Sequence, residues 1–222
     1  MNDNISAFNS KKYDEEIKHT LPYYDEFYKQ VIDVISNYKS KPLTWLDIGC
    51  GTGKMAELAY KETEIEKFVF LDNSSEMIKI ARSRFNYSNS DFIISDVRDI
   101  NYNNEFDIIT AIQVNHYLTY KDRISVIKKC YEALNLGGIF MTFENFAPSS
   151  ELTQKLYLKR WKSYQLKHGN SHIECNNHIN RYNKNYFPIQ ISEHFKILKD
   201  NGFKAAEILW LSYMQVGILA IK

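Results

Sequence analysis

The sequence predicts an α/β fold with a doubly wound, mostly parallel seven-stranded sheet and helices on both faces. Three observations predict this class. Short apolar runs alternate with helical patterns between residues 43 and 143, which is typical of right-handed βαβ units. A glycine-rich turn follows the first apolar run, at residues 49–53. The last two apolar runs are joined by too few residues for a helical crossover, so the last strand is expected to be antiparallel.

Seven apolar runs are expected to form the strands because each is short and bounded by turn residues or helical patterns. The parallel strands are expected at Leu43–Ile48, Lys67–Asp72, Phe92–Ile94, Phe106–Ala111 and Ile139–Phe143. The antiparallel pair is expected at Ala205–Leu211 and Gln215–Ile221.

Helices are expected where apolar residues recur three or four positions apart. They run through Tyr24–Ile35, Met55–Ala59, Ser74–Arg84, Lys121–Leu134 and Ser192–Asp200. Ser74 is expected to be an N-cap, and Gly137-Gly138 to end the helix that precedes them. The segment Pro148–Pro188 has neither pattern, and we expect it to form a helical cap inserted after the fifth strand.

The composition is that of an ordinary soluble globular protein. The 222 residues include 28 Lys and Arg against 27 Asp and Glu, a net charge of +1, and 44% are hydrophobic. No run approaches the 18 or so apolar residues that a membrane span needs, and the first residues lack the apolar core of a signal peptide. Three cysteines without a C-x-x-C pair favour a reducing compartment, so a cytoplasmic protein is expected.

The glycine turn predicts a ligand site, because open α/β sheets bind ligands at the carboxyl ends of their strands. A phosphate-binding P-loop is excluded, since Gly53-Lys54 is followed by Met55 and residue 48 is not glycine. A dinucleotide site needs G-x-G-x-x-G, whereas this turn reads G-x-G-x-G. That alternative is weakened but stays open, because Asp72 lies about twenty residues further on, where a ribose-binding acid belongs.

A third interpretation accounts for more of the residues. Asp47, Asp72 and Asp96 lie at the ends of three consecutive predicted strands. Three such acids suit a ligand that carries an ammonium group, a ribose diol and an adenine amino group. S-adenosylmethionine carries all three, together with a sulfonium.

Five stretches resemble the successive motifs of class I S-adenosylmethionine-dependent methyltransferases. They are TWLDIGCGTG, FVFLDNSSEMIKIAR, DFIISDVRDI, FDIITAIQVNHYL and LNLGGIFMTFE. The terminal antiparallel strand pair also resembles that family rather than dinucleotide domains. The resemblance implies S-adenosylmethionine as cofactor, with its methionine end at the glycine turn, its ribose at Asp72 and its adenine at Asp96 and Val97. The expected cofactor contacts are Tyr13, Asp47, Gly49, Gly51, Asp72, Asn73, Met77, Asp96, Val97 and Gln113.

With this cofactor, four parts of the chain are expected. Residues 1–40 would form an N-terminal helical lid and residues 41–147 the cofactor-binding core. Residues 148–188 would form the inserted cap. Residues 189–222 would supply a helix and the antiparallel strand pair that complete the core.

Two residues are candidate catalytic groups. Methyl transfer from a sulfonium relies on in-line positioning and desolvation, and a base is needed only for an acceptor that must lose a proton. His116 after the fourth strand and Glu144 at the end of the fifth could be that base. The alternatives are structural: His116 as a packed or capping side chain, and Glu144 as a residue that orients a loop.

The cap contains a cluster of histidines and a cysteine at spacings of four, three and three, which on a helix would share one face. Helix-breaking glycine and asparagines interrupt that pattern, so no metal is expected; the cluster is His168, His172, Cys175 and His178. We expect the cap and the lid to supply the substrate contacts instead. These are Tyr24, His178, Arg181 and Tyr182.

The two ends of the chain resemble a narrower group, the carboxy-S-adenosylmethionine synthase family. The stretches are YDEEIKHTLPYYDEFYKQVIDVI and SEHFKILKDNGFKAAEILWLSYMQVGILAIK. That family makes a carboxylated cofactor from prephenate for wobble-uridine modification in tRNA. One of its arginines, late in the cap, binds the extra carboxylate, and Arg181 stands near that place. The surrounding HINRYNKNYFPIQ and His116 depart from the family, and the likeness is compatible with a homodimer.

The sequence is consistent with four functions. The leading hypothesis is an S-adenosylmethionine-dependent methyltransferase that acts on a small-molecule substrate, and the alternative is an enzyme like carboxy-S-adenosylmethionine synthase. A nicotinamide oxidoreductase and a non-catalytic module that binds the cofactor are the others. Nucleic acid is not expected as a partner because Lys and Arg are dispersed and balanced by acids, and no membrane partner is expected.

Overall fold

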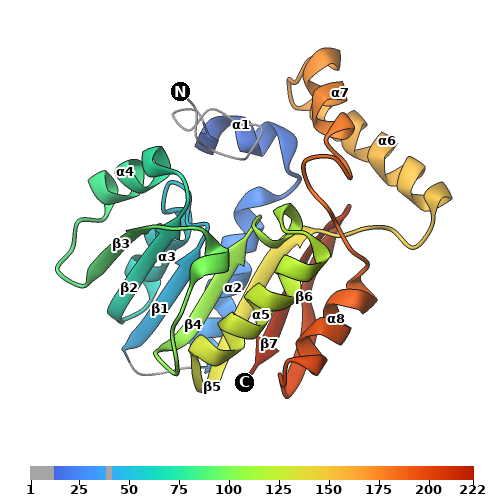
Figure 1. The fold of residues 1–222 in the computed structure, drawn as a ribbon. Helices are drawn as coiled ribbons and strands as arrows, with labels where there is room; N and C mark the ends of the chain where they lie inside the picture. The colour runs from blue at the N-terminus through green and yellow to red at the C-terminus, as the bar shows by residue number, and fades with distance from the viewer. Residues whose placement is uncertain (1–12, 39–41) are drawn as a thin grey trace.

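The computed structural model describes residues 13–38 and 42–222, and its centre is one seven-stranded sheet (Figure 1). The strands are β1 (Leu43–Ile48), β2 (Ile65–Asp72), β3 (Ser90–Ile94), β4 (Phe106–Ile112), β5 (Leu134–Asn145), β6 (Ala205–Ser212) and β7 (Gln215–Ile221). Their order is β3-β2-β1-β4-β5-β7-β6. Strands β1 to β5 are parallel to one another, and β7 is antiparallel to both β5 and β6. The predicted fold class, including the antiparallel last strand, is confirmed.

Helices cover both faces of the sheet, and a separate apolar core fills the space between the helices and the sheet on each face (Figure 1). One face carries α2 (Tyr24–Tyr38), α3 (Lys54–Glu62) and α4 (Ser75–Arg84), and the other carries α5 (Tyr120–Ala133) and α8 (Ile191–Asp200). The central strand β4 is buried at every position. Burial from both faces explains why the central strands are continuous apolar runs rather than alternating ones.

Three further helices lie beyond the sheet, over the carboxyl ends of the parallel strands (upper part of Figure 1). They are α1 (Tyr13–Thr20), α6 (Glu151–Lys167) and α7 (His172–Asn180). α6 and α7 are the helical cap predicted after the fifth strand. The indole N–H of Trp161 on α6 donates to the carbonyl of Thr20 at 2.7 Å and joins the cap to α1. Within the described ranges, no helix combines the length and the apolar character needed to cross a membrane.

The expected N-terminal lid divides into two helices with different surroundings. Residues 1–12, 39 and 40 of that segment lie outside the described residues. α1 lies over the edge of the sheet, whereas α2 packs against the sheet itself. The ring of Phe27 on α2 stacks on Phe143 with centroids 5.2 Å apart and contacts Trp210 edge-on at 5.3 Å. α2 is thus a layer of the core, and only α1 is placed as a lid would be.

The glycine pair at 137 and 138 does not end the preceding helix, so that prediction is wrong. α5 ends at Ala133, and β5 begins at the next residue. The pairing of β4 with β5 shifts register between Phe106 and Ile108, which leaves room for the glycines inside the strand. Gly137 has φ +71, and a Cβ at Gly138 would lie 2.8 Å from the carbonyl oxygen of Asn135. The glycines therefore permit an irregularity of β5 rather than a helix stop.

Candidate functional site

β1 ends in a loop whose glycines adopt positive φ values that other residues avoid. The values are +66° at Gly49, +54° at Gly51 and +85° at Gly53. A Cβ at Gly49 would lie 2.3 Å from Cγ2 of Val114, and one at Gly53 would lie 2.7 Å from the ring of Phe85. A Cβ at Gly51 would meet no atom within 4 Å. Packing closes the loop at its two ends, while the backbone of Gly51 faces open space that a ligand can occupy.

The carboxylate of Asp72, at the end of β2, ties this loop to the sheet. Oδ2 accepts a hydrogen bond from the backbone N–H of Gly51 at 2.9 Å, and Oδ1 accepts one from the N–H of Ser74 at 2.8 Å. Because β1 and β2 are parallel neighbours, their carboxyl ends meet and bring the acid to the loop. Each carboxylate oxygen has a second acceptor position, so Asp72 can also accept hydrogen bonds from a diol.

A cavity of about 220 Å³ lies at the carboxyl ends of β1 to β4. Nine of the ten expected cofactor contacts line it: Tyr13, Gly49, Gly51, Asp72, Asn73, Met77, Asp96, Val97 and Gln113. We call it the main cavity. The structure therefore brings together residues from four separate motifs, and α1 contributes Tyr13 from above.

Asp96 lines the main cavity with its carboxylate already engaged by Arg98. The guanidinium donates from Nε at 2.9 Å and from Nη2 at 2.6 Å, and the backbone N–H of Arg98 donates at 2.9 Å. These hydrogen bonds lower the pKa of Asp96 below its usual value, so the carboxyl is ionised at neutral pH. Arg98 itself also lines the cavity. It was not predicted as a site residue from the sequence, although the motif DVRDI places this cation two residues after Asp96.

Asp47, the tenth expected contact, lies in a smaller adjoining cavity that shares Tyr13, Gly49 and Gly51 with the main one. Its side chain is buried and accepts a hydrogen bond from the hydroxyl of Thr110 at 2.6 Å. Burial raises the pKa of Asp47 to about 7, against the opposing effect of that hydrogen bond. A cationic group beside it would favour the ionised form.

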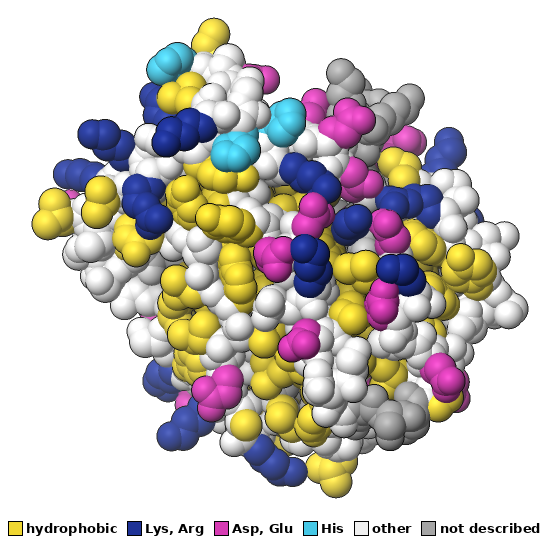
Figure 2. Space-filling model, turned by 180° about the vertical axis from the view of Figure 1, so that it is seen from behind, with side chains coloured by type: hydrophobic (Ala, Val, Ile, Leu, Met, Phe, Trp, Pro, Cys, Tyr) yellow, Lys and Arg dark blue, Asp and Glu magenta, His cyan; other side chains and the backbone are white. Residues whose placement is uncertain are grey.

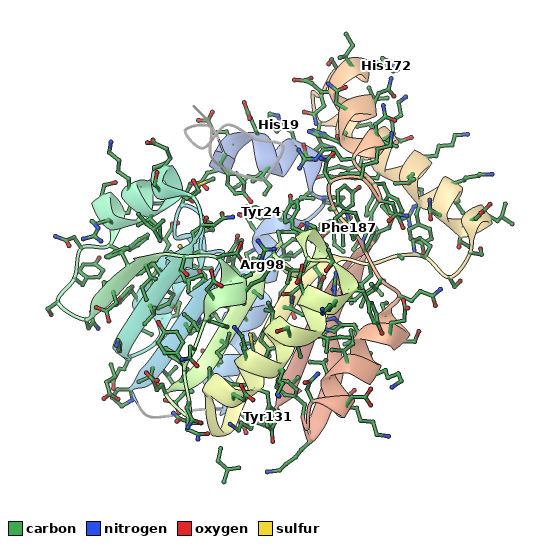
Figure 3. All side chains as sticks on the ribbon, in the orientation of Figure 1. His19, Tyr24, Arg98, Tyr131, His172 and Phe187 are labelled. Carbon is green, nitrogen blue, oxygen red and sulfur yellow. The ribbon has the colours of Figure 1, made fainter. Side chains whose placement is uncertain are left out.

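Three tyrosines form the other wall of this adjoining cavity. They are Tyr13, Tyr24 and Tyr28, and burial raises the pKa of each hydroxyl well above its usual value. The hydroxyls of Tyr24 and Tyr28 are hydrogen-bonded to each other. Figure 3 shows Tyr24 beneath α1 at the upper edge of the sheet. Tyr24 was expected on the substrate side, and the structure places it next to Asp47 instead.

Gln113 stands where the main cavity meets a third one. It has φ +61, which is uncommon for a residue with a side chain, and its backbone N–H donates to the carbonyl of Phe143 at 2.6 Å. Its side-chain amide donates to the same carbonyl at 3.2 Å and to Oε1 of Gln215 at 2.8 Å. These bonds to β5 and β7 hold the strained conformation, and such strain concentrates at functional sites.

The third cavity, of about 50 Å³, lies between the sheet and the cap, and we call it the cap-side cavity. Gln113 and Tyr117 line both this cavity and the main one, so the two adjoin. Its lining includes three expected residues, His116, His178 and Arg181, and the hydroxyl-bearing ring of Tyr186. Tyr182, also expected here, is buried and packs edge-on against Tyr186 at 5.7 Å. It supports the lining rather than forming it.

The two histidines of this cavity are neutral at physiological pH. Burial lowers the pKa of His116 to about 4, and burial together with Arg181 lowers that of His178. Nδ1 of His116 lies 3.4 Å from the backbone N–H of Asn145 and accepts from it, which assigns the ring proton to Nε2. Arg181 is half-buried and supplies the permanent positive charge among the described residues of the lining.

Glu144 lies outside these cavities, in a buried ion pair. Its carboxylate contacts the guanidinium of Arg123 at 2.5 Å, and both side chains are fully buried. The hydroxyl of Thr142 donates to it at 3.2 Å, and His194 lies 3.8 Å away. Arg123 holds the pKa of Glu144 below its usual value against the opposing effect of burial. A carboxylate held in this way orients α5 and β5 rather than meeting a substrate.

The histidines and cysteine of the cap do not converge. His168 stacks on Tyr164, His178 hydrogen-bonds to Gln165 at 2.6 Å, and Cys175 is buried. His172 lies at the outer end of α7 (Figure 3). Among the described residues, no three His, Cys, Asp or Glu side chains are placed to hold a metal ion.

The site fits S-adenosylmethionine in shape and in donor set. Gly51 leaves a cradle that a side chain would fill, and Asp72 faces the main cavity where a ribose would lie. Asp47 offers a carboxylate on the side of the glycine loop away from Asp96. A ligand with an ammonium group at one end and an adenine at the other requires acids placed in this way.

The chain is similar in sequence to known proteins. Residues 46–138 match the model of a methyltransferase domain. The chain is 26% identical over 206 residues to carboxy-S-adenosyl-L-methionine synthase of Nautilia profundicola, covering 89% of this chain and 85% of that protein. It is 23% identical over 218 residues to the enzyme of the same name from Helicobacter hepaticus, covering 95% and 90%.

Solved structures share the fold. A methyltransferase from Haloferax volcanii, solved with the activator Trm112, superposes with a TM-score of 0.68 at 12% identity and 96% coverage of both chains. A phosphoethanolamine N-methyltransferase of Haemonchus contortus, solved with S-adenosylhomocysteine, gives 0.66 at 17% identity, over 90% of this chain and 43% of that one. The match of residues 46–138 to a methyltransferase domain and the likeness to the synthases together support an S-adenosylmethionine-dependent enzyme.

Proposed function

We propose that the protein is a methyltransferase that acts on a small, anionic acceptor bound in the cap-side cavity. The observation that carries this proposal is the junction of the two cavities at Gln113 and Tyr117. A cofactor in the main cavity and an acceptor in the cap-side cavity would meet at these two residues. The small volume of the cap-side cavity, about 50 Å³, supports a small molecule as the acceptor.

The cofactor would lie with its ribose on Asp72, its adenine beside Asp96 and Val97, and its methionine end towards Asp47. Arg98 neutralises Asp96 in part and fixes its carboxylate, which supports a positioned hydrogen-bond acceptor. Asp14 on α1 supports closure from above, because it accepts from the hydroxyl of Thr52 at 2.7 Å and pairs with Arg84 at 3.1 Å.

The cofactor supplies an electrophilic methyl group on a sulfonium, whose S–C bond breaks as the bond to the acceptor forms. The residues around the cap-side cavity favour an acceptor that is already nucleophilic. His116 has a low pKa and carries its proton on Nε2, so it can donate a hydrogen bond but is a weak base. Arg181 would attract and orient an anionic group. Catalysis would then come from positioning in a cavity with little water.

A second function is favoured by Arg181 and by the relatives. Synthesis of a carboxylated S-adenosylmethionine would place a carboxylate on the cofactor's former methyl carbon, at the junction of the two cavities. A cation in the cap-side cavity suits that product as well as it suits an anionic acceptor. The named synthases cover 89% and 95% of this chain, which supports this alternative.

The decisive experiment measures product formation and Arg181 together. The protein is incubated with methyl-labelled S-adenosylmethionine and panels of small acids, including prephenate, and products are identified by mass. Transfer of the label to an acid supports the methyltransferase. Conversion of the cofactor to a form heavier by one carboxylate supports the second function. Absence of both would contradict the proposal.

Arg181→Ala should weaken the acid's apparent affinity about 10- to 100-fold, the range for a lost charged hydrogen bond. The same change should leave S-adenosylhomocysteine affinity within about twofold. Lys184→Ala, an exposed cation in the same segment, is the matched control and should change neither value.

Buried unpaired cysteines and the lack of a described membrane helix also support our proposal of a cytoplasmic enzyme. A homodimer remains a prediction from the resemblance.

A further inference from the structure

A groove on the outer side of α6 shares no lining residue with the cavities described above. Its volume is about 680 Å³, within the range of ligand sites. α6 forms one wall. Tyr23, just before α2, and Tyr213, in the turn between β6 and β7, form the other. We call it the α6 groove.

Two rows of side chains four residues apart run along the groove face of α6, because positions i and i+4 of a helix lie one above the other. The first row is Lys155, which lies beyond the groove lining, then Lys159, Ser163 and Lys167; the second is Leu156, Arg160, Tyr164 and the C-cap residue His168. From the first to the last lysine the row is about 18 Å long, at 1.5 Å per residue. The opposite side of the helix is anchored by buried Trp161, so these rows face outward.

The charge of α6 is far from the balance of the whole chain. The helix has five Lys and Arg and one acid, a net charge of +4, so the rest of the chain sums to −3. Among the described residues, none of these five cations lies within ion-pair distance of a carboxylate, whereas cations on α2, α3, α5 and α8 do. Figure 2 shows Lys and Arg gathered on the projecting part at upper left, which α6 and α7 form. The three cations that line the groove, Lys159, Arg160 and Lys167, are therefore not neutralised locally.

Aromatic rings line the groove between the cations. The guanidinium of Arg160 lies 4.4 Å from the ring centroid of Tyr213, and Tyr164 meets that ring edge-on at 5.7 Å. Tyr23 is 57% exposed and rests its ring edge-on against Trp210 at 6.1 Å. Both Tyr23 and Tyr213 have φ near +55°, which is unfavourable for bulky residues. The backbone thus accepts strain at both tyrosines that form the wall facing α6.

We propose that the α6 groove binds the phosphate-and-base unit of a nucleotide. The lysines and Arg160 would hold the phosphate, and an exposed tyrosine face would stack on the base. Cations interleaved with stacking aromatics are the combination that single-stranded nucleic acids bind. The unit can come from a free nucleotide or from single-stranded RNA. The site is independent of the proposed reaction because it shares no residue with the cavities that would carry it.

The test uses the full chain saturated with S-adenosylhomocysteine, so that the cofactor cavity cannot take up the probe. Fluorescence polarisation measures binding of a labelled, unstructured 12-nucleotide RNA, and unlabelled adenosine monophosphate is the competitor. We expect binding at 50 mM salt that weakens with a log–log slope of about −0.7 for each phosphate held. If adenosine monophosphate displaces the RNA, a free nucleotide is a sufficient ligand. If the RNA binds and the mononucleotide does not displace it, the ligand is single-stranded RNA.

Charge-reversed and ring-deleted variants locate the site. Lys159→Glu combined with Lys167→Glu should weaken RNA binding at least tenfold, and Tyr23→Leu should weaken it about 5- to 100-fold. The control, Lys128→Glu combined with Lys199→Glu, reverses two exposed cations on α5 and α8 and should change binding less than twofold. Unchanged S-adenosylhomocysteine affinity verifies that each variant is folded.

Three results would overturn the proposal. One is no RNA or mononucleotide binding at 50 mM salt. Another is equal loss in the groove and control variants, which would show non-specific attraction. The third is binding of anionic lipid vesicles, but not of nucleotides, through the same lysines.

Discussion

Binding of S-adenosylhomocysteine should tighten as the pH rises from 6 to 7, because Asp47 must lose a proton to face the ligand's ammonium group. Asp47 is 3% exposed, and burial raises its pKa to about 7. Its folded pKa is raised, so the carboxyl is mostly protonated at pH 6. The ionised fraction then rises from about 0.1 to about 0.5 at pH 7. If the ligand selects the ionised form, the dissociation constant falls about fivefold over this interval.

Isothermal titration calorimetry between pH 5.5 and 7 measures this dependence. Titrations in two buffers with different ionisation enthalpies give the number of protons released, which should approach one at pH 6. Asp47→Asn should bind more weakly and with a flat pH profile. Asp96→Asn is the matched control. The pKa of Asp96 lies below its usual value, so its carboxyl does not titrate between pH 5.5 and 7.

Two results would refute the reasoning. A dissociation constant that stays constant from pH 5.5 to 7 would mean that the ligand does not select the ionised carboxylate. A pH dependence that survives in Asp47→Asn would assign the proton to another group. His116 cannot supply it, since its pKa of about 4 keeps the ring neutral throughout.

Three further outcomes follow from the same geometry. Asp14→Ala removes the hydrogen bonds that join α1 to Thr52 in the glycine loop and to Arg84 on α4, and it should weaken S-adenosylhomocysteine binding about 3- to 10-fold by calorimetry. Unchanged binding would mean that α1 does not close the site. Gly51→Ala should weaken the ligand about tenfold or more and lower the free energy of unfolding by about 1–2 kcal/mol in urea titrations, because φ is +54 and the Cβ would enter the cavity. His194 is fully buried, with its pKa lowered to about 4 by burial, so the unfolded chain binds the proton more readily and stability is lost as the pH falls from about 6.5 to 4. His194→Phe should therefore remove about 2 kcal/mol of the destabilisation between pH 7 and 5, and an equal pH dependence in both proteins would contradict this.

The fold was predictable because its signals are local. Alternating apolar runs and helical patterns set the order of elements, and the short link between residues 211 and 215 requires an antiparallel pair. The exception is Gly137-Gly138, where helix-stop residues serve an irregular strand. Their role depends on the register between β4 and β5, which no single segment encodes.

The cavity lining was predictable to the extent that it lies at strand ends. Asp72 and Asp96 follow strands whose carboxyl ends must meet, so their convergence follows from topology. Arg98, Tyr117 and the ion pair of Glu144 with Arg123 were not predictable in this way. The role of Arg98 depends on the direction of its side chain, which folds back onto Asp96. The ion pair of Glu144 with Arg123 depends on a contact between two elements, α5 and β5. The positive charge of α6 was hidden because it is cancelled by acids elsewhere in the chain.

The most direct test of the central claim is mass spectrometry of the small molecule released when the purified protein is denatured. We expect S-adenosylmethionine or S-adenosylhomocysteine from the wild type and its loss from a variant with Asp72→Ala. Release of a carboxylated S-adenosylmethionine would leave the assignment of the cofactor site unchanged and favour the carboxy-S-adenosylmethionine synthase function. A nicotinamide dinucleotide, released from the wild type and lost in the same variant, would contradict the assignment of this cavity.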